Sequence, residues 1–167
     1  MSLRINDTVP NLDLATDQGN FKLHDFIGDS WTILFSHPKD FTPVCTTEFI
    51  AFAEIHPQLR DLNCELMGLS VDSVYSHIAW VRNVKEKMGV EITFPVIADL
   101  NKDVATLYGM INPGESSTET SRAVFIIDDL VKPGQHLISL FPASLLHFLA
   151  TKNYQDHFDF VDGEREL

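Results

Sequence analysis

The sequence has few cysteines, little positive charge and no long apolar run. Of its 167 residues only two are cysteines, which are more often free thiols than a structural bridge in an intracellular chain. A net charge of -12 argues against nucleic acid or an anionic membrane as a partner, because both bind basic surfaces. No apolar run reaches the roughly 18 residues that cross a bilayer, and the N-terminus lacks the apolar core of an export signal. We therefore expect a cytoplasmic protein that binds neither nucleic acid nor membrane.

Composition and length indicate one folded domain. Hydrophobic residues make up 44% of the chain and charged residues 22%, a balance typical of a globular protein. No segment has the composition of a linker or a repeat, so we expect a single domain over residues 1–167. The seven histidines are dispersed and the glycines are too scattered for a phosphate-binding loop. The sequence therefore predicts no metal site and no cofactor.

Short apolar runs alternate with helical patterns along the chain. The expected strands are 31–36, 65–71, 93–99, 123–128 and 136–142. The expected helices are about 46–62, 73–88, 103–108 and one that begins at 144. Pro57 should kink or divide the first helix. The second should bury the face that carries Ile78, Val81, Val84 and Met88. This alternation predicts an α/β fold with helices on both faces of a sheet.

The most informative segment is 37–48, where the first expected strand is followed by a helix. It contains Cys45, preceded by Thr42 and Pro38. The unpaired N–H groups and the dipole at a helix start stabilise negative charge, so we expect a depressed pKa for Cys45 and a large thiolate fraction. The alternative for a lone cysteine is a buried small apolar residue. The position of Cys45 at the start of a helix favours a nucleophile.

This segment resembles the active-site segment of the peroxiredoxins, thiol peroxidases of the thioredoxin fold, and the 1-Cys branch in particular. Further matching segments are 28–31, 69–73, 94–99 and 121–125. Together they cover about residues 3–128 in the order that the family shows. The resemblance implies a thioredoxin-like central mixed β-sheet flanked by helices on both faces.

By resemblance, four residues form the catalytic set. Cys45 is the peroxidatic nucleophile, and Thr42 would hydrogen-bond both thiolate and peroxide. Pro38 would shield the pocket. Arg122 would bring a guanidinium beside the sulfur, which favours the thiolate and holds hydrogen-bond geometry. The alternative role for Arg122 is a surface salt bridge.

Three more residues are expected at the substrate. His37 is implied by the 1-Cys branch as a pocket residue that assists the thiolate or the substrate, and its alternative is a satisfied, partly buried histidine. Glu48 would fix Arg122, or would only favour the helix start by its charge. Pro43 is placed with the substrate-binding residues, although it and Thr42 could simply form a turn.

The implied function is reduction of hydrogen peroxide and alkyl hydroperoxides, in antioxidant defence and redox homeostasis. Cys64 is expected to be a buried core thiol, and no cysteine follows it. The Cys45 sulfenic acid should then be reduced by an external thiol, glutathione or a thioredoxin-like protein. The resemblance also implies a homodimer or a larger homo-oligomer.

Two alternatives remain. One is a non-enzymatic thiol sensor or chaperone-like oligomer whose Cys45 oxidises but turns over slowly. The other is a phospholipase A2-like acyl hydrolase, which some 1-Cys relatives carry around a Gly-Asp-Ser-Trp-Gly segment. Here Ser30 would act with His24 and with Asp128 or Asp129, but Thr32 replaces the final glycine.

The resemblance fades after Asp128. Residues 129–167 diverge and lack the family's Gly-Arg-Asn segment. A second family arginine has no counterpart, which predicts weaker charge stabilisation at Cys45. The 1-Cys branch continues into a C-terminal domain that embraces the dimer partner, and this sequence ends at Leu167 before such a domain.

Overall fold

The computed structural model describes residues 2–4, 7–112, 114, 118–131 and 135–141, with the backbone alone described from residue 129 onward. It contains one sheet with the strand order β2-β1-β5-β4-β3-β6-β7. The strands are β1 Asp13–Thr16, β2 Gly19–Lys22, β3 Trp31–Ser36, β4 Cys64–Ser70, β5 Val96–Ala98, β6 Val124–Val131 and β7 Gln135–Phe141. The helices are α1 Leu23–Ile27, α2 Pro43–Asp61, α3 Val74–Met88 and α4 Asp103–Leu107.

The sheet is mixed, and β3 lies where its direction changes. β3, β4 and β5 are parallel, whereas β6 runs antiparallel to β3. Parallel neighbours need a crossover, and α2 and α3 supply it for the pairs β3–β4 and β4–β5. The chain therefore leaves the carboxyl end of β3 and enters α2 directly, at an edge where α/β sheets commonly bind ligands.

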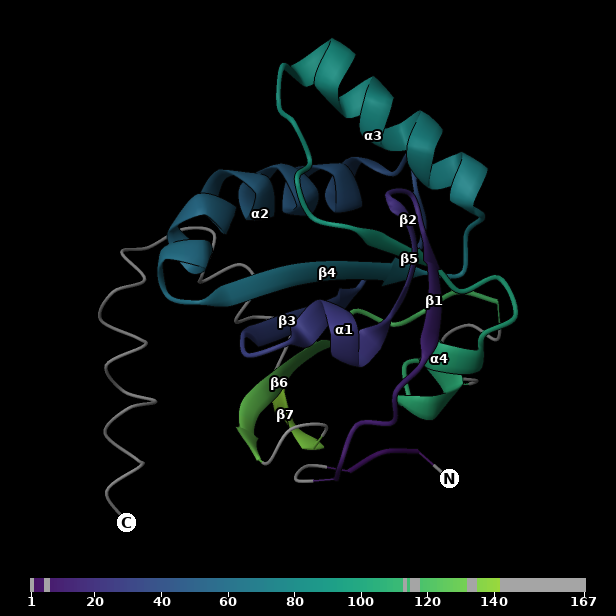
Figure 1. Ribbon diagram of the computed structural model, residues 1–167. Coiled ribbons are helices and arrows are strands. Elements are labelled where there is room, and N and C mark those ends of the chain that lie inside the picture. The colour runs from purple at the N-terminus through teal and green to yellow at the C-terminus, as the bar shows by residue number, and fades with distance from the viewer. Residues whose placement is uncertain (1, 5–6, 113, 115–117, 132–134, 142–167) are drawn as a thin grey trace.

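Helices cover both faces of this sheet, as expected (Figure 1). Successive residues of β3, β5 and β6 pack into opposite cores. On one face α2 and α3 pack against Ile33 and Phe35 of β3, with Phe49 and Trp80 among the buried side chains. On the other face α1 and α4 pack against strand residues that include Leu34. Near-continuous burial along β3 follows from this double cover.

The structure contradicts parts of two expectations about the helices. Pro57 lies inside one continuous helix, so it does not divide α2, and Phe52 and Leu59 on either side of it are buried in the core. In α3 the buried residues are His77, Trp80 and Val84. The expected Ile78 and Met88 are exposed instead.

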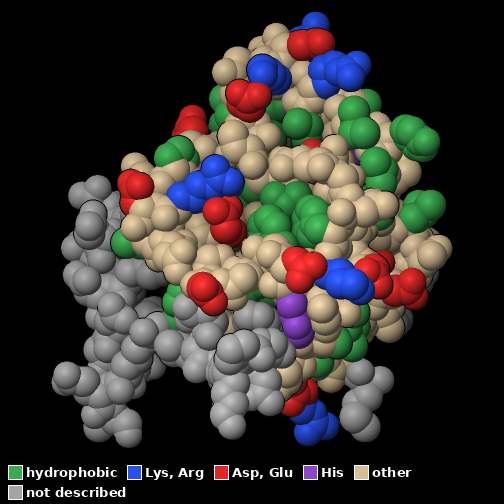
Figure 2. Space-filling model, in the orientation of Figure 1, with side chains coloured by type: hydrophobic (Ala, Val, Ile, Leu, Met, Phe, Trp, Pro, Cys, Tyr) green, Lys and Arg blue, Asp and Glu red, His purple; other side chains and the backbone are tan. Residues whose placement is uncertain are grey.

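The remaining differences concern the ends of the chain. The β1–β2 hairpin and α1 were not predicted, since these short edge elements alternate polar and apolar residues only weakly. The helix expected from residue 144 lies outside the described residues. Among the described residues no helix is long and apolar enough to cross a membrane. Acidic and basic side chains are scattered over the face that Figure 2 shows.

Candidate active site

The active-site loop, residues 37–42, carries the chain from β3 to α2. Thr42 is the N-cap residue of α2 in extended conformation, and Pro43 is at the first helical position, where its missing N–H costs nothing. Cys45 therefore lies in the first turn, whose N–H groups have no helical partner and favour a negative charge nearby. Its side chain is fully buried, at 0% exposure.

Strand register brings Arg122 to the same place. In the β3–β6 ladder Phe35 pairs with Val124. Just beyond it, the N–H of Ser36 donates to the carbonyl of Ala123 (2.9 Å) and the N–H of Ala123 donates to Ser36 Oγ (3.1 Å). Side chains two residues apart in extended chain share a face, so Arg122 emerges on the same side as Val124, which packs in the α2 core.

Three predicted residues meet at this point. Arg122 Nη2 lies 3.5 Å from Cys45 Sγ, and Arg122 Nε donates to the two carboxylate oxygens of Glu48 at 3.0 and 3.2 Å. Arg122 and Glu48 are 33% and 27% exposed, so the ion pair reaches the surface. Glu48 holds the guanidinium in one orientation, which leaves Nη2 to face the sulfur.

The other loop residues are placed less closely. Thr42 Oγ1 donates to the carbonyl of Lys39 at 3.2 Å and so closes the loop on itself. Pro38 is half-buried in the loop, and Pro43 is exposed at the helix start. Phe41 and Val44 are large apolar side chains at 55% and 57% exposure beside the buried thiol.

His37 is buried, at 1% exposure. Its Nε2 donates to Asp40 Oδ1 at 2.8 Å, and its Nδ1 has no hydrogen-bond partner in the described part of the chain. Burial lowers the pKa of His37, which the neighbouring Asp40 only partly offsets. The ring packs edge-on against Phe49 and beside Trp80.

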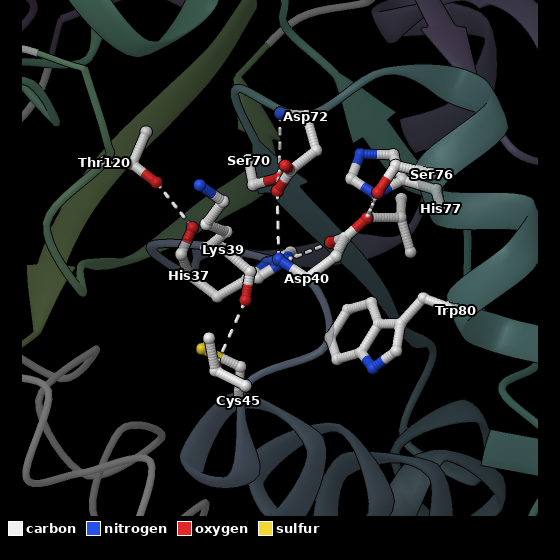
Figure 3. Close-up of polar contacts among 12 residues, drawn as sticks. His37, Lys39, Asp40, Cys45, Ser70, Asp72, Ser76, His77, Trp80 and Thr120 are labelled. Carbon is white, nitrogen blue, oxygen red and sulfur yellow. Dashed lines mark hydrogen bonds and ion pairs between the residues drawn. The ribbon is translucent and has the colours of Figure 1, made fainter. Parts of the chain in front are cut away.

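Sequence reasoning missed the partners of Asp40. Besides His37, its carboxylate accepts from Ser76 Oγ and from His77 Nδ1, both at 2.7 Å (Figure 3). The signal in the sequence was a pair of adjacent polar residues, Ser76 and His77, within the expected helix 73–88. Burial opposes ionisation of Asp40, but the hydrogen bonds from His37 and His77 outweigh it and hold the pKa of Asp40 well below its usual range.

The same cluster is where the described residues come nearest to a metal site. The ligand atoms of His37, Asp40 and His77 lie within 4.8 Å of one another. The facing nitrogens already hydrogen-bond to the carboxylate at 2.7 and 2.8 Å. The geometry is that of a hydrogen-bonded network.

The second thiol lies at the start of β4. Cys64 is 1% exposed and its Sγ faces the carbonyl of Glu65 at 3.8 Å. Burial, with the charge of Glu65, raises the pKa of Cys64 to about 12. A thiol that keeps its proton in an apolar core is a poor nucleophile.

The residues of the acyl-hydrolase alternative lie in different elements, with Ser30 in the turn before β3 and His24 in α1. Ser30 Oγ donates to the carbonyl of Ile27 at 2.7 Å, and His24 Nε2 lies 2.8 Å from the carbonyl of Val9. Gly28, with a φ of 53°, makes the bend that precedes β3. Asp128 lies within β6, and the side chain of Asp129 is not described.

Comparison with known proteins places this architecture in a family. Residues 5–132 match the AhpC/TSA family model. A peroxiredoxin of Aquifex aeolicus is 54% identical over 126 residues, which are 75% of this chain and 57% of the relative. Peroxiredoxin 2 of Caldanaerobacter subterraneus is 49% identical over 160 residues, 96% of this chain and 69% of that protein.

Solved structures agree. A yeast mitochondrial 1-Cys peroxiredoxin, studied for thiol resolution by glutathione and thioredoxin systems, superposes with a TM-score of 0.76 at 40% identity, over 97% of this chain and 79% of the other. The C45S mutant of peroxiredoxin 6 of Arenicola marina gives 0.74 at 34% identity, over 89% and 72%. The chain spans between half and two thirds of several curated relatives that it matches. It belongs to the AhpC/TSA family and is a peroxiredoxin by sequence and by its thioredoxin-like fold.

Proposed function

We propose that the protein is a thiol-dependent peroxidase that reduces hydrogen peroxide and alkyl hydroperoxides at Cys45. One observation carries the proposal, the guanidinium of Arg122 at 3.5 Å from a sulfur in the first turn of α2. The Cys45 thiolate attacks the peroxide oxygen that carries the hydrogen. A sulfur–oxygen bond forms, the oxygen–oxygen bond breaks, and the other oxygen leaves as hydroxide or alkoxide, which takes a proton from solvent to give water or alcohol. Sulfur is oxidised by two electrons to the sulfenic acid, and the peroxide is reduced.

The charge that moves in this step determines the residue roles. Negative charge passes from sulfur to the leaving oxygen, and Arg122 can stabilise it at both positions while Glu48 holds the guanidinium still. Thr42 would bring its hydroxyl from the Lys39 carbonyl to the bound peroxide. His37, Pro38 and Pro43 would complete the pocket wall that keeps the site dry.

Turnover requires a second thiol, and we propose that it is external. Cys64 is buried and holds its proton, so it is a poor partner for the Cys45 sulfenic acid. A soluble thiol, glutathione or a thioredoxin-like protein, would attack the sulfenic sulfur, release water and form a mixed disulfide that a second thiol then reduces. The yeast mitochondrial relative, described with glutathione and thioredoxin systems, supports this 1-Cys cycle.

We further propose a cytoplasmic antioxidant role and a homodimer or larger homo-oligomer. The exposed Phe41 and Val44, three residues apart beside the site, support association, since exposed apolar side chains that lie together can form a contact surface. Sedimentation of the reduced protein should give a mass of at least two chains. A single-chain mass at micromolar concentration would contradict this part of the proposal.

Peptide mass spectrometry tests the 1-Cys cycle. We expect dimedone to label the Cys45 peptide of peroxide-treated protein as sulfenic acid. The labelling should disappear when glutathione or a thioredoxin is added before the dimedone. Cys64 should remain an unmodified thiol throughout. A quantitative Cys45–Cys64 disulfide would overturn the external-thiol proposal. A Cys45 sulfenic acid that forms but persists after a thiol is added would favour the non-enzymatic thiol sensor.

A further inference from the structure

The active-site loop is attached to α3 through one buried carboxylate. The Asp40 side chain, 1% exposed, accepts from His37 at Oδ1 and from both Ser76 and His77 at Oδ2 (Figure 3). A second attachment lies beside it, because the Asp40 N–H donates to Asp72 Oδ2 at 3.0 Å. The loop that leads into Cys45 is therefore fixed from the β4–α3 side as well as by its own strand.

His77 is the member of this network whose protonation the geometry determines. Its Nδ1 lies 2.7 Å from Asp40 Oδ2, and its Nε2 lies 3.1 Å from the carbonyl oxygen of Ile97 in β5. Both neighbours are acceptors in this pairing, because Asp40 is ionised and a carbonyl has no proton to give. A histidine that faces two acceptors satisfies both only by donating from both nitrogens, which is the imidazolium form.

The charges around His77 favour this cation. The Asp40 carboxylate is in contact with His77, and Asp17 in the β1–β2 turn interacts favourably with the His77 charge. Asp72 is close by, where its carboxylate accepts from the Asp40 backbone N–H. Among the described residues His37 is a neighbouring ring that would oppose a positive charge if it were protonated. Burial lowers the pKa of His37, so that ring stays neutral. A buried cation is retained only where it is paired and hydrogen-bonded, and at 0% exposure His77 meets both conditions.

The ionised Asp40 in turn defines His37. A neutral ring has one N–H, and the Asp40 carboxylate requires it at Nε2. Nδ1 is then a bare lone pair inside the core, which agrees with its lack of a partner among the described residues. The carbonyl of His37 is held independently, by the Thr120 hydroxyl at 2.6 Å.

We propose that His77 and Ser76 are positioning residues for the peroxidase site. The His77 imidazolium keeps Asp40 ionised, and Asp40 fixes the active-site loop and the Nε2–H tautomer of His37. This inference deepens the proposed function and its kinetic part rests on it. Trp80 of α3 also contacts the start of α2, because its indole N–H donates to Thr46 Oγ1 at 3.2 Å. α3 thus supports the loop at one end and the Cys45 turn at the other.

Nitrogen-15 NMR of the reduced, histidine-labelled full chain tests the charge state without any peroxide. We expect both ring nitrogens of His77 to carry protons at neutral pH, and His37 to show one protonated and one bare nitrogen. Assignment uses His77→Gln and His37→Gln. A bare nitrogen on His77 at neutral pH would overturn the proposal, whether or not the protein reduces peroxide.

Kinetics test the positioning role. We expect His77→Gln, which keeps an amide donor but removes the charge, to lower the second-order rate of Cys45 with hydrogen peroxide roughly 10- to 100-fold. Ser76→Ala should lower it less. Asn83→Ala, an exposed change on the same helix, is the matched control and should leave the rate unchanged.

The pH profile separates positioning from general damage. His77 is one of the groups that lower the pKa of Asp40, so in His77→Gln this pKa should rise and the carboxylate should take up a proton at a higher pH than in the parent. As the pH falls into mild acid, the rate of His77→Gln should therefore fall more steeply than the parent rate. A folded His77→Gln protein with the parent rate and profile would overturn the proposal. If His77→Gln does not fold, Ser76→Ala is measured instead, and a parent rate and pH profile in that variant would overturn the positioning role. A parent protein inert to peroxide would instead defeat the proposed function and leave the NMR result standing.

Discussion

Cys45 and Cys64 are equally buried thiols in the same hydrophobic core, yet their surroundings are opposite. Their exposures are 0% and 1%. Cys45 lies in the first turn of α2, with Arg122 at 3.5 Å. Cys64 begins a strand and faces a carbonyl oxygen beside the carboxylate of Glu65. Burial alone makes a thiol inert, so the difference between them lies in the sign of the nearby charge.

Removing each thiol in turn should have the largest and most unequal effect. We expect Cys45→Ser to abolish peroxide reduction, because the nucleophile is lost. Cys64→Ala should retain the parent rate, since Cys64 keeps its proton and is sealed from solvent. A coupled assay with excess dithiothreitol measures both. Loss of activity in a folded Cys64→Ala protein would show that the two thiols act together.

Removing the cation beside Cys45 should reduce the contrast without abolishing it. We expect Arg122→Gln to lower the rate with hydrogen peroxide roughly 10²- to 10³-fold, the usual cost of one preorganised donor at developing charge. Arg82→Gln on the exposed face of α3 is the matched control. Stopped-flow measurement under single-turnover conditions gives the rates. An unchanged rate in Arg122→Gln would remove the guanidinium from the account.

Alkylation across pH should show the inert thiol directly. Cys64 with a pKa raised from 9.0 to about 12 holds about a thousandth of the thiolate of an ordinary cysteine at pH 8. Because the pKa is raised, reactivity grows only as the pH climbs toward that value. We expect iodoacetamide to label Cys64 in the native protein only in strong alkali, and readily after unfolding in urea. Mass spectrometry of the Cys64 peptide reads this out, and rapid labelling near pH 8 would contradict it.

Serine substitutions should separate the two sites by stability, with the smallest effect. Cys64→Ser places a hydroxyl in an apolar core and should lower the free energy of unfolding by about 1–3 kcal/mol. Cys45→Ser should cost less, because Arg122 can donate to the new oxygen. Urea denaturation compares the two variants. Equal losses would mean that the guanidinium does not serve the residue at position 45.

The site was more predictable from sequence than its support. The segment 37–48 carries Cys45 and Glu48 within one helical turn of each other, and resemblance located Arg122 before a strand-like run. The fold class and its covered sheet followed from the alternation of apolar runs and helical patterns. The Cys45 motif is local, so it can be recognised in a short stretch of sequence, whereas Arg122 was placed by resemblance.

The network around Asp40 was not predictable in the same way. Asp40 and His77 are far apart in sequence and meet only after β4 and α3 have packed. Apolar periodicity predicted that Ile78 and Met88 lie on the buried face of α3. His77 is buried instead, where its ring hydrogen-bonds to the Asp40 carboxylate. Pro57 stays in a continuous α2 for a similar reason, since tertiary packing overrides local preference.

The central claim is that the surroundings of Cys45 make a buried sulfur a fast nucleophile toward peroxide. The most direct test is the second-order rate of the reduced protein with hydrogen peroxide at pH 7, measured by stopped flow beside free cysteine. We predict a rate several orders of magnitude above that of free cysteine. A rate equal to that of free cysteine would contradict the account.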